Sequence, residues 1–559
     1  MLNFTLRHFI TLRVAVIACA VFANKKRELM AKNSKTIPSA SFEQHLWDTA
    51  NKLRGSVESS EYKHVVLSLI FLKFISDKFE AQRKSLVEQG MGDYVEQIEF
   101  YAKDNVFYLP EQARWSYIQQ QMKQDDIAVK IDTALHTVEK NNPSLKGALP
   151  DNYFSRLGLV SNKLASLIDT INNIDTAANE SGADDIKSEE DLVGRVYEYF
   201  LGKFAASEGK GGGEFYTPKS IVSLIAEMIE PYKGKIYDPC CGSGGMFVQS
   251  LKFIDSHKGN KKDISIYGQE YTNTTYKLAK MNLAVRGISA NLGEVAGDSF
   301  FKDQHPDLKA DFILANPPFN QKQWRGENEL VDDPRWAGFD VPPTGNANYA
   351  WIMHMISKLS EHGTAGFVLA NGSMSTNTSG EGEIRKKIIE QDLVDCMIAL
   401  PGQLFYTTQI PVCLWFISKN KKAVDASEDF AKRRNRQGET LFIDAREMGS
   451  MVSRVNKELT NVDIAHIAQT YHAWRGEKKD ENYENIAGYC KSATLDDIKA
   501  NDYVLTPGRY VGAADIEDDG IPFETKMAEL SQILYHQMEK GEELDKAIRK
   551  NLEALGYGN

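Results

Sequence analysis

The chain has 559 residues, of which 42% are hydrophobic and 26% are charged, a composition typical of globular proteins and a length sufficient for about three domains. Its formal net charge is −11, which argues against a protein that grips DNA unaided, because such proteins usually carry a basic balance. The six cysteines are scattered without metal-ligand spacing, so we expect a reduced, cytoplasmic protein with no metal site.

The first segment, residues 1–29, has a basic start and an apolar run from Val14 to Ala23. This pattern resembles a signal peptide, but it is too short and too interrupted by Arg13 to cross a bilayer. Met30 opens Met-Ala-Lys-Asn-Ser-Lys, a common kind of cytosolic start. We therefore expect residues 1–29 to be a misassigned upstream extension.

Residues 30–190 are predicted to form a helical N-terminal domain. Ser41 marks a helix start, apolar residues recur at helical spacing after it, and Val65 to Phe79 is apolar enough for a buried helix. No catalytic cluster stands out here, so a packed helical bundle is the favoured interpretation. The acidic stretch from Asn179 to Glu190 is typical of a linker.

A glycine-rich loop and a helix follow the linker, in a domain that we expect to span residues 191–420. The loop ends in Gly213-Glu214-Phe215-Tyr216-Thr217-Pro218. Thr217 suits the N-cap of the next helix and Pro218 suits its first position. By itself, the loop fits a simple hinge or a ligand cover.

A short strand at residues 235–237 leads into a second glycine turn, Asp238-Pro239-Cys240-Cys241-Gly242-Ser243-Gly244-Gly245, and then into a helix. The glycines let the backbone approach a ligand, and the helix N-terminus favours a carboxylate. Asp238 can accept from an ammonium group. The turn has no Gly-Lys-Ser/Thr, which argues against a triphosphate loop.

Two further acids follow predicted strands. Glu270 ends the strand at residues 264–268, at the place where ribose hydroxyls are usually held, and Asp298 in Gly297-Asp298-Ser299 can meet an adenine amino group. Each acid alone is more often a cap or turn residue. Sites for a carboxylate, an ammonium, a ribose and an adenine together match S-adenosylmethionine.

The fourth strand end is the most informative one. The apolar run at residues 312–315 is stopped by Asn316-Pro317-Pro318-Phe319, because neither proline can donate to a sheet ladder. The Asn316 side-chain oxygen and the Pro317 carbonyl can accept hydrogen bonds from a planar NH2, and Phe319 can stack on the ring that bears it. Taken alone, the tetrapeptide fits a plain proline turn equally well.

The rest of this domain completes a sheet of about seven strands, with later strands expected at residues 365–370, 393–400 and 412–418. Pro401 to Tyr406 fits either a wall of the pocket or an ordinary turn. The long loop from Asn320 to Asn346 could pack against DNA, because loops of this length are usually functional or disordered.

The C-terminal region, residues 421–559, contains two charged stretches. Lys419 to Arg436, which begins at its edge, fits a solvated connector or a phosphate-contacting patch. Lys526 to Leu555 has apolar residues at helical spacing among many charges, and we expect a helix there that binds a partner.

These motifs, G-E-F-Y-T-P, D-P-C-C-G-S-G-G, Q-E, G-D-S and N-P-P-F in this order, resemble the modification subunit of type I restriction-modification systems. The likeness covers about residues 42–512. It implies an S-adenosyl-L-methionine-dependent adenine-N6 DNA methyltransferase of the α/β class, with a seven-stranded Rossmann-like class I sheet, an N-terminal helical domain and a C-terminal helical tail. Members typically act on double-stranded DNA as two copies with one specificity subunit, and a restriction subunit can join them.

The resemblance also implies a role for each matching residue. The target adenine would be held by the catalytic residues Asn316, Pro317, Pro318 and Phe319. Glu270 would hold the cofactor's ribose, with Asp238 and Asp298 assisting. The other residues implied to line the cofactor site are Gly213, Glu214, Phe215, Tyr216, Thr217, Pro218, Gly242, Ser243, Gly244 and Gly245.

Other functions fit parts of the pattern. A protein-glutamine methyltransferase also suits N-P-P but favours Tyr at the position of Phe319, and cytosine-N4 enzymes typically replace Asn316 with Ser. Cytosine-C5 chemistry needs a cysteine nucleophile where this chain has Asn316. A stand-alone DNA amino-methyltransferase and a cofactor-binding scaffold that only assembles partners are the remaining alternatives. No domain that would read a DNA sequence is apparent in the chain.

Overall fold

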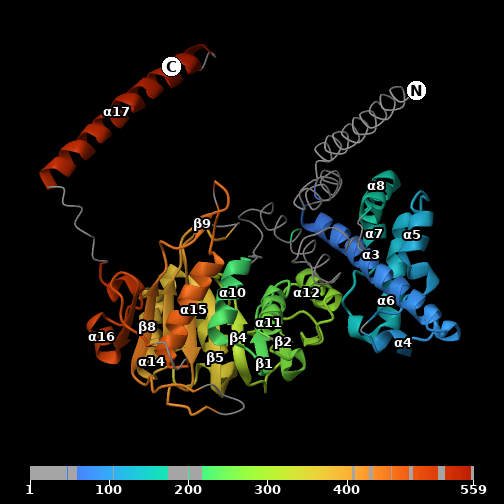
Figure 1. The fold of residues 1–559 in the computed structure, drawn as a ribbon, viewed down its shortest axis with the longest axis horizontal. Coiled ribbons are helices and arrows are strands. Elements are labelled where there is room, and N and C mark those ends of the chain that lie inside the picture. The colour runs from blue at the N-terminus through green and yellow to red at the C-terminus, as the bar shows by residue number, and fades with distance from the viewer. Residues whose placement is uncertain are drawn as a thin grey trace, which may run out of the picture.

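The computed structural model describes residues 59–173 and 217–554 with short gaps, together with residues 47 and 199. Figure 1 shows three parts: a helical bundle near the N-terminus, an α/β body, and the helix α17 (Phe523–Ala554) standing away from that body. Among the described residues no helix is long and apolar enough to cross a membrane. The proposed extension at residues 1–29 and the glycine-rich residues Gly213 to Tyr216 lie outside the described part of the chain.

The helical bundle is built around α3 (Ser59–Glu88), whose residues 64–76 are all buried. A helix that is apolar on all sides must be enclosed by other elements. The enclosing helices are α4 (Glu99–Ala102), α5 (Trp115–Gln121), α6 (Ile127–Asn141), α7 (Tyr153–Arg156) and α8 (Ser161–Asn172). The predicted helical N-terminal region is therefore present as a packed bundle.

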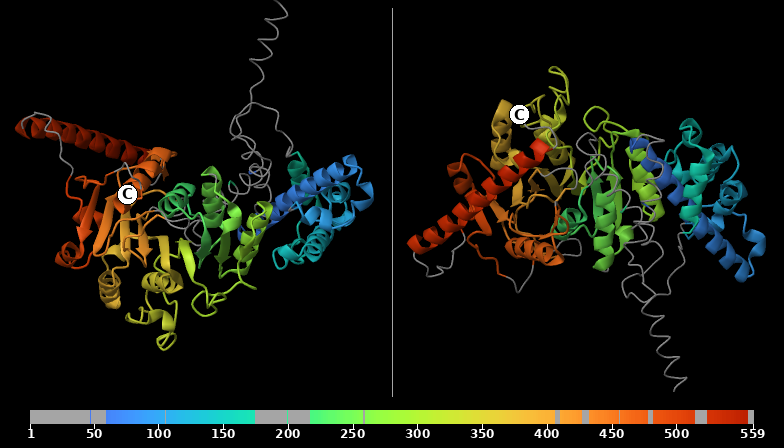
Figure 2. Two further views of the ribbon diagram at one scale, coloured as in Figure 1. Left: turned by 60° about the horizontal axis from the view of Figure 1, so that its bottom comes forward. Right: turned by 90° about the horizontal axis from the view of Figure 1, so that it is seen from above.

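The bundle is fastened to the α/β body through α12 (Asn273–Val285). Apolar side chains of α12, namely Leu278, Met281 and Val285, belong to the core of the bundle. Lys277 Nζ also donates to the Leu149 carbonyl at 3.0 Å. Both views in Figure 2 accordingly show the bundle, in blue and teal, beside the green helices of the body.

The body contains one sheet of nine strands in the order β11-β8-β6-β7-β5-β4-β1-β2-β3. Its strands are β1 (Gly234–Asp238), β2 (Ile264–Gly268), β3 (Ala290–Asn291), β4 (Ala310–Ala315), β5 (Leu359–Ala370), β6 (Val394–Ala399), β7 (Val412–Ser418), β8 (Glu439–Asp444) and β11 (Cys490–Thr494). β1 to β5 pair in parallel and β7 is antiparallel to both β5 and β6. The predicted α/β class is thus confirmed, with two strands more than the seven expected.

Helices cover both faces of the sheet, and two apolar cores lie between them and the strands. Leu314 of β4 packs in the core with α10 (Lys219–Ile229), α11 (Gly245–Ser256) and α15 (Asn461–Arg475). Ile313 and Ala315 of the same strand pack in the other core with α13 (Asn348–Lys358) and α14 (Glu381–Glu390). Neighbouring side chains of a strand point to opposite faces, so β4 is buried on both sides and its end is held rigidly.

The sheet continues past residue 420, where the sequence suggested a domain boundary. β8 pairs in parallel with β6, β11 adds to β8 in antiparallel, and α16 (Leu495–Ala500) follows directly. Only the small ribbon of β9 (Ser450–Met451) and β10 (Lys457–Glu458) lies outside this sheet among the described strands. Much of the predicted C-terminal region is therefore part of the body.

The arginines at the end of the basic stretch form ion pairs within the protein, whereas its lysines Lys419, Lys422 and Lys432 are exposed. Arg436 is fully buried and pairs with the buried Asp395 at 3.2 Å. Arg433 pairs with Glu477 at 2.8 Å and Arg434 with Glu439 at 2.7 Å. These arginines neutralise the buried acids Asp395 and Glu477 and the partly exposed Glu439.

Candidate functional site

The candidate site lies where neighbouring parallel strands end at one edge of the sheet. Asp238 on β1 pairs with Gly268 on β2, and Tyr237 pairs with Ile313 on β4. This register brings Asp238, Glu270 and Asn316 to the same edge, the carboxyl ends of the strands, which is the place where open α/β sheets bind ligands. The sequence therefore predicted correctly that these side chains gather at one edge.

Asn316 is held by a residue that is distant in the sequence. Its Nδ2 donates to Thr217 Oγ1 at 2.9 Å, while its Oδ1 is buried and has no hydrogen-bond partner among the residues that the structure describes. A buried acceptor without a partner costs about 1–3 kcal/mol, so such a group in a strand end is a strong candidate for ligand binding. The sequence predicted that Thr217 would cap α10, and this prediction is wrong. Pro218 is the N-cap, and the Thr217 hydroxyl instead accepts a hydrogen bond from Asn316.

Pro317 is buried and Pro318 is partly exposed, and they turn the chain so that Phe319 lies half-buried after them. The Phe319 ring meets the ring of Phe405 edge to face, with centroids 5.6 Å apart. Phe405 is itself 3% exposed. The segment that starts at Pro401 therefore contacts Phe319 through Phe405, which packs against the ring that was predicted to stack on a base. Its role as a wall of the pocket stays a prediction.

The glycine turn after β1 forms an open cradle. Gly242 and Gly244 have positive φ angles of 54° and 80°, and α11 begins at Gly245. A Cβ atom placed on Gly242 or Gly245 would meet no atom within 4 Å. Asn282 Nδ2 donates to the Ser243 carbonyl at 2.7 Å and holds the turn from α12. The backbone is thus fixed and still accessible, as a cradle for a small ligand requires.

Asp238 lies under this turn and is 1% exposed. Its Oδ1 accepts from the Cys240 amide at 3.0 Å. Burial raises the pKa of Asp238 to about 7, against the weaker lowering effect of the hydrogen bond from the Cys240 backbone. A cation placed beside this carboxylate would favour its ionised form, which fits the ammonium group expected from the sequence.

Glu270 braces the cradle from β2. One carboxylate oxygen accepts from the Gly242 amide at 3.1 Å and the other accepts from the Thr272 amide at 2.8 Å. A carboxylate oxygen has lone pairs for more than one donor, so Glu270 can hold the loop and still receive ribose hydroxyls. Glu270 contacts the glycine turn directly, so it would position a cofactor that binds over that turn.

Asp298 occupies the turn after β3. Its Oδ1 accepts from the Phe300 amide at 2.7 Å and more weakly from the Phe301 amide at 3.3 Å. Ser299 Oγ donates to the Pro239 carbonyl at 2.5 Å, which ties this turn to the one after β1. The Asp298 turn, the Asp238 turn and the Glu270 loop are consequently one connected edge.

The sequence prediction missed three residues at this edge. Tyr271 follows Glu270 directly and its ring is 72% exposed, so an aromatic residue after the acid was the available signal. Asn371 follows β5, the neighbour of β4, and its Oδ1 is buried without a hydrogen-bond partner in the described part of the chain. Phe405, described above, was included only within a segment of undecided role.

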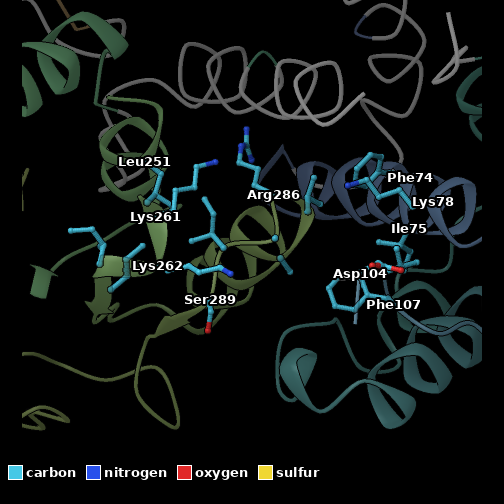
Figure 3. A pocket seen from close by; sticks show the side chains of 17 residues that line it. Phe74, Ile75, Lys78, Asp104, Phe107, Leu251, Lys261, Lys262, Arg286 and Ser289 are labelled. Carbon is cyan, nitrogen blue, oxygen red and sulfur yellow. The ribbon is translucent and has the colours of Figure 1, made fainter. Parts of the chain in front are cut away.

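The cavity drawn in Figure 3 is a different place. It has a volume of about 470 Å³ and lies between α3 of the bundle and the ends of α11 and α12. Its wall contains none of the predicted site residues. It opens beside the start of β2, whereas the predicted site is at the strand's carboxyl end, so we do not assign the chemistry to it.

Two family models match the chain. The model described as N-6 DNA Methylase matches residues 188–519, and the model described as HsdM N-terminal domain matches residues 42–174. The first covers the whole described sheet and the second covers the helical bundle up to its last helix. The division of the fold into bundle and body therefore coincides with the two matched regions.

Curated relatives match along most of the chain. The type I restriction enzyme HindI methylase subunit of Haemophilus influenzae is 49% identical over 462 residues, covering 80% of this chain and 100% of that protein. The type I restriction enzyme MjaIX methylase subunit of Methanocaldococcus jannaschii is 39% identical over 553 residues, covering 96% of this chain and 95% of that protein.

Solved structures share the fold. A type I restriction-modification system methyltransferase subunit from Streptococcus thermophilus superposes with a TM-score of 0.67 at 22% identity, covering 85% of this chain and 99% of that one. A chain from a structure of type I R-M complex assembly superposes with a TM-score of 0.57 at 17% identity, covering 93% and 99%.

Proposed function

Since the chain belongs to the N-6 DNA methylase family, as a methylase subunit of type I restriction-modification systems, we propose that its methylation site is the sheet edge that carries Asn316. The methyl donor would bind over the adjacent glycine turn. The chain is an adenine-specific DNA N6-methyltransferase. The protein-glutamine alternative is not favoured by this membership, and neither is a stand-alone enzyme.

The observation that carries the proposed site is the Asn316 amide. Its nitrogen is engaged by Thr217, so its buried oxygen is the atom that faces an incoming group and has no partner. The exocyclic amine of adenine has two N–H donors, of which Asn316 Oδ1 and the Pro317 carbonyl would receive one each. Phe319, fixed by Phe405, supplies the face against which the base would stack.

The residues of this pocket act by positioning and by polarising the amine. An exocyclic amine is a poor nucleophile while its lone pair is delocalised into the ring. Two acceptors pulling on its protons favour a pyramidal nitrogen as the methyl approaches. With a sulfonium methyl donor bound beside it, the nitrogen would form its new bond to the methyl carbon as the donor's carbon–sulfur bond breaks, and the extra proton would leave to solvent. No covalent intermediate with the protein is needed, and the adenine must be flipped out of the duplex to reach the pocket.

The cofactor is S-adenosyl-L-methionine in this proposal, and it supplies an electrophilic methyl group on a sulfonium. Asp238 would hold its ammonium, Glu270 its ribose and Asp298 its adenine amine, with the exposed ring of Tyr271 beside the ribose site. The open backbone at Gly242 and Gly245 supports this fit, as does the buried carboxyl of Asp238, whose ionised form needs a cation beside it. Gly213 to Pro218 would complete the cofactor site, with Thr217 acting through Asn316.

The deciding test replaces Asn316 with alanine in the assembled complex. We expect the methyl-transfer rate to fall by at least about 10²-fold, because an interaction of this kind typically contributes 10²–10³ in rate. Binding of S-adenosylmethionine, measured by calorimetry, should change less than about twofold. Asn328→Ala, at an exposed position of the following loop, is the matched control and should methylate normally. Substantial methylation by Asn316→Ala would contradict the assignment.

We further propose that the chain works with a specificity subunit on double-stranded DNA, with two copies of this chain per specificity subunit, and that a restriction subunit can join. The net charge of −11 supports the need for a partner, because the chain alone lacks the basic balance of a DNA-binding protein. Because its proposed substrate is DNA, we also propose that the protein works in the cytoplasm.

The surface proposed for that partner is the apolar stripe of α17. Five of its apolar residues are each more than half exposed, namely Ile533, Leu534, Met538, Leu544 and Ile548. They recur at helical spacing and so lie along one side. We expect Leu534→Glu with Ile548→Glu to abolish co-purification with the specificity subunit, whereas His536→Glu, on the other side of the helix, should not. Retained assembly by the double variant would refute the assignment.

A further inference from the structure

The loop between Asn320 and Asn346 follows Phe319 and is packed against the cofactor side of the site. Trp324 and Trp336 are buried in this loop, 6% and 3% exposed. The Trp324 ring lies 4.6 Å from the ring of Phe300, which belongs to the Asp298 turn. Phe300 also lies 4.3 Å from Trp351 of α13. The loop therefore connects the residues that continue from the base pocket with the residues that form the cofactor edge.

Arg335 is the polar centre of this connection. Its guanidinium holds the carboxylate of Asp333 through Nε at 2.7 Å and Nη2 at 2.6 Å. Its Nη1 donates to the Ser299 carbonyl at 2.9 Å and its Nη2 donates to the Phe300 carbonyl at 2.6 Å. The side chain is 11% exposed. A planar fork of five donors suits such a set of fixed acceptors, whereas a lysine ammonium does not.

The same guanidinium reaches β1 through a histidine. Arg335 Nη1 lies 3.1 Å from His354 Nδ1, and His354 Nε2 lies 3.2 Å from the Tyr237 hydroxyl. Burial, with the positive charge of Arg335, lowers the pKa of His354 to about 3, so the ring is neutral. Arginine has no acceptor, so Nδ1 accepts, Nε2 carries the proton and donates to Tyr237. Tyr237 directly precedes Asp238, and this chain of contacts ends at the cofactor turn.

The outer side of the loop is not built to contact a DNA backbone. Its exposed charged residues include the acids Glu327, Glu329, Asp332 and Asp340, against the single exposed lysine Lys322 in the same stretch. Phosphate contacts are made mainly by basic side chains. Packing against DNA, as the sequence suggested for this loop, would not explain why its inner side is buried. The contacts of Arg335 with the Asp298 turn do explain it.

We propose that Arg335 is a positioning residue that couples the two halves of the site, so that filling the cofactor side strengthens binding of the target DNA and the reverse. The proposal rests on the proposed function. Arg335 holds the Asp298–Phe300 turn to the segment that continues from Phe319. When a ligand orders the Asp298–Phe300 turn, the segment after Phe319 therefore loses less conformational entropy when it binds its own ligand. The same holds in the other direction, because coupling between two binding sites is reciprocal.

The test measures the dissociation constant of S-adenosylhomocysteine for the assembled complex with and without a duplex that contains the target site. The ratio of the two values is the coupling factor. We expect a factor of about 5 or more for the natural protein, within the usual range for coupled sites. Arg335→Ala should reduce it below about 2, and Arg335→Lys should reduce it nearly as far because the fork is lost while the charge remains. The lysine variant also keeps the test decisive if the alanine variant fails to fold.

Arg446→Ala is the matched control, because Arg446 also holds the aspartate two residues before it, Asp444, at 2.6 Å, but its own side chain is 58% exposed. Its coupling factor should equal that of the natural protein. A purely structural role for Arg335 would lower the thermal midpoint and both affinities while leaving the factor unchanged, and that result would overturn the proposal, as would a factor of one in the natural protein. If the natural complex did not methylate adenine at all, the proposed function would fail instead.

Discussion

The base side and the cofactor side of this site are built in opposite ways. On the cofactor side the three acids that the structure describes, Glu270, Asp298 and Asp238, each accept hydrogen bonds from backbone amides of the turns around them. On the base side Asn316 keeps one buried oxygen without any partner. These hydrogen bonds hold the turns of the empty cofactor pocket in place, whereas the unpaired Asn316 oxygen costs stability until a ligand arrives.

This difference indicates which half of the site carries which task. A cofactor pocket that must bind the same molecule in every cycle gains from preorganised turns, because less ordering is left to the binding step. A base pocket must reject the many groups that do not bring two N–H donors, and an unpaired acceptor penalises them. Variants on the base side should therefore reduce the rate of transfer, whereas variants on the cofactor side should reduce cofactor affinity.

The largest effect beyond Asn316 is expected on the base side. Phe319→Ala removes the ring that would stack on the flipped adenine, and such stacking contributes about 1–3 kcal/mol per base. We expect kcat/KM for DNA methylation to fall about 10–100-fold while the affinity for S-adenosylmethionine stays unchanged. Phe319→Tyr keeps the ring and should retain most of the activity. Equal losses in cofactor affinity and rate would show that the two halves are not separate.

The corresponding variant on the cofactor side is Glu270→Gln. The amide keeps one acceptor but loses the charge, and it leaves either the Gly242 or the Thr272 amide without its present partner. Hydrogen bonds to charged groups contribute about 1.5–3 kcal/mol, so we expect the dissociation constant of S-adenosylmethionine to rise about 10-fold or more. The maximal rate at saturating cofactor should fall much less. A large fall in that rate would place Glu270 in the transfer step itself.

Asp238 makes the comparison sensitive to pH. Burial raises its pKa to about 7, against a usual value near 3.9 in an unfolded chain. The folded protein holds this proton more tightly, so the contribution to stability is complete below about pH 4 and is lost as the pH rises to about 7. Asp238→Asn cannot ionise and should raise the thermal midpoint of the cofactor-free protein at pH 8.

Cofactor binding should respond to pH in the opposite direction. An ammonium group favours the ionised carboxylate, so affinity for S-adenosylmethionine should weaken as the pH falls below about 7. Asp238→Asn should bind the cofactor several-fold more weakly at pH 8 and lose this pH dependence, which calorimetry at pH 6 and pH 8 would measure. A variant that loses both stability and affinity would indicate that the carboxylate only supports the turn.

The parts of this site that the sequence predicted are those decided by local chemistry. Strand ends at Asp238, Glu270 and Asn316 could be located because a proline or a glycine turn stops an apolar run at each of them or nearby. Because the strands were expected to be parallel, these three residues were expected at the same edge of the sheet. The parts that it did not predict depend on partners that are distant in the chain.

Thr217 shows why such partners escape local reasoning. A threonine before a proline and a helix suits an N-cap, but Asn316, 99 residues further along the chain, takes its hydroxyl. Arg335 and Phe405 gain their roles in the same way, from contacts with the Asp298 turn and with Phe319. Likewise, Arg436 was interpreted from its basic neighbours, although the buried Asp395 on β6 decides its environment. Charge patterning along a chain does not report which acid the fold will bring beside a base.

Asn371 gives the smallest expected effect and the sharpest use of the comparison. Like Asn316 it follows a strand of the central sheet, and its Oδ1 is buried without a hydrogen-bond partner. If this oxygen also waits for a donor from DNA, Asn371→Ala should lower kcat/KM about threefold or more and leave cofactor affinity unchanged. If the Asn371 oxygen binds nothing, Asn371→Ala removes the free-energy cost of a buried acceptor without a partner. The thermal midpoint should then rise with no change in kcat/KM. We expect the first outcome, because an unpaired acceptor beside β4 has the feature that distinguishes the base side from the cofactor side.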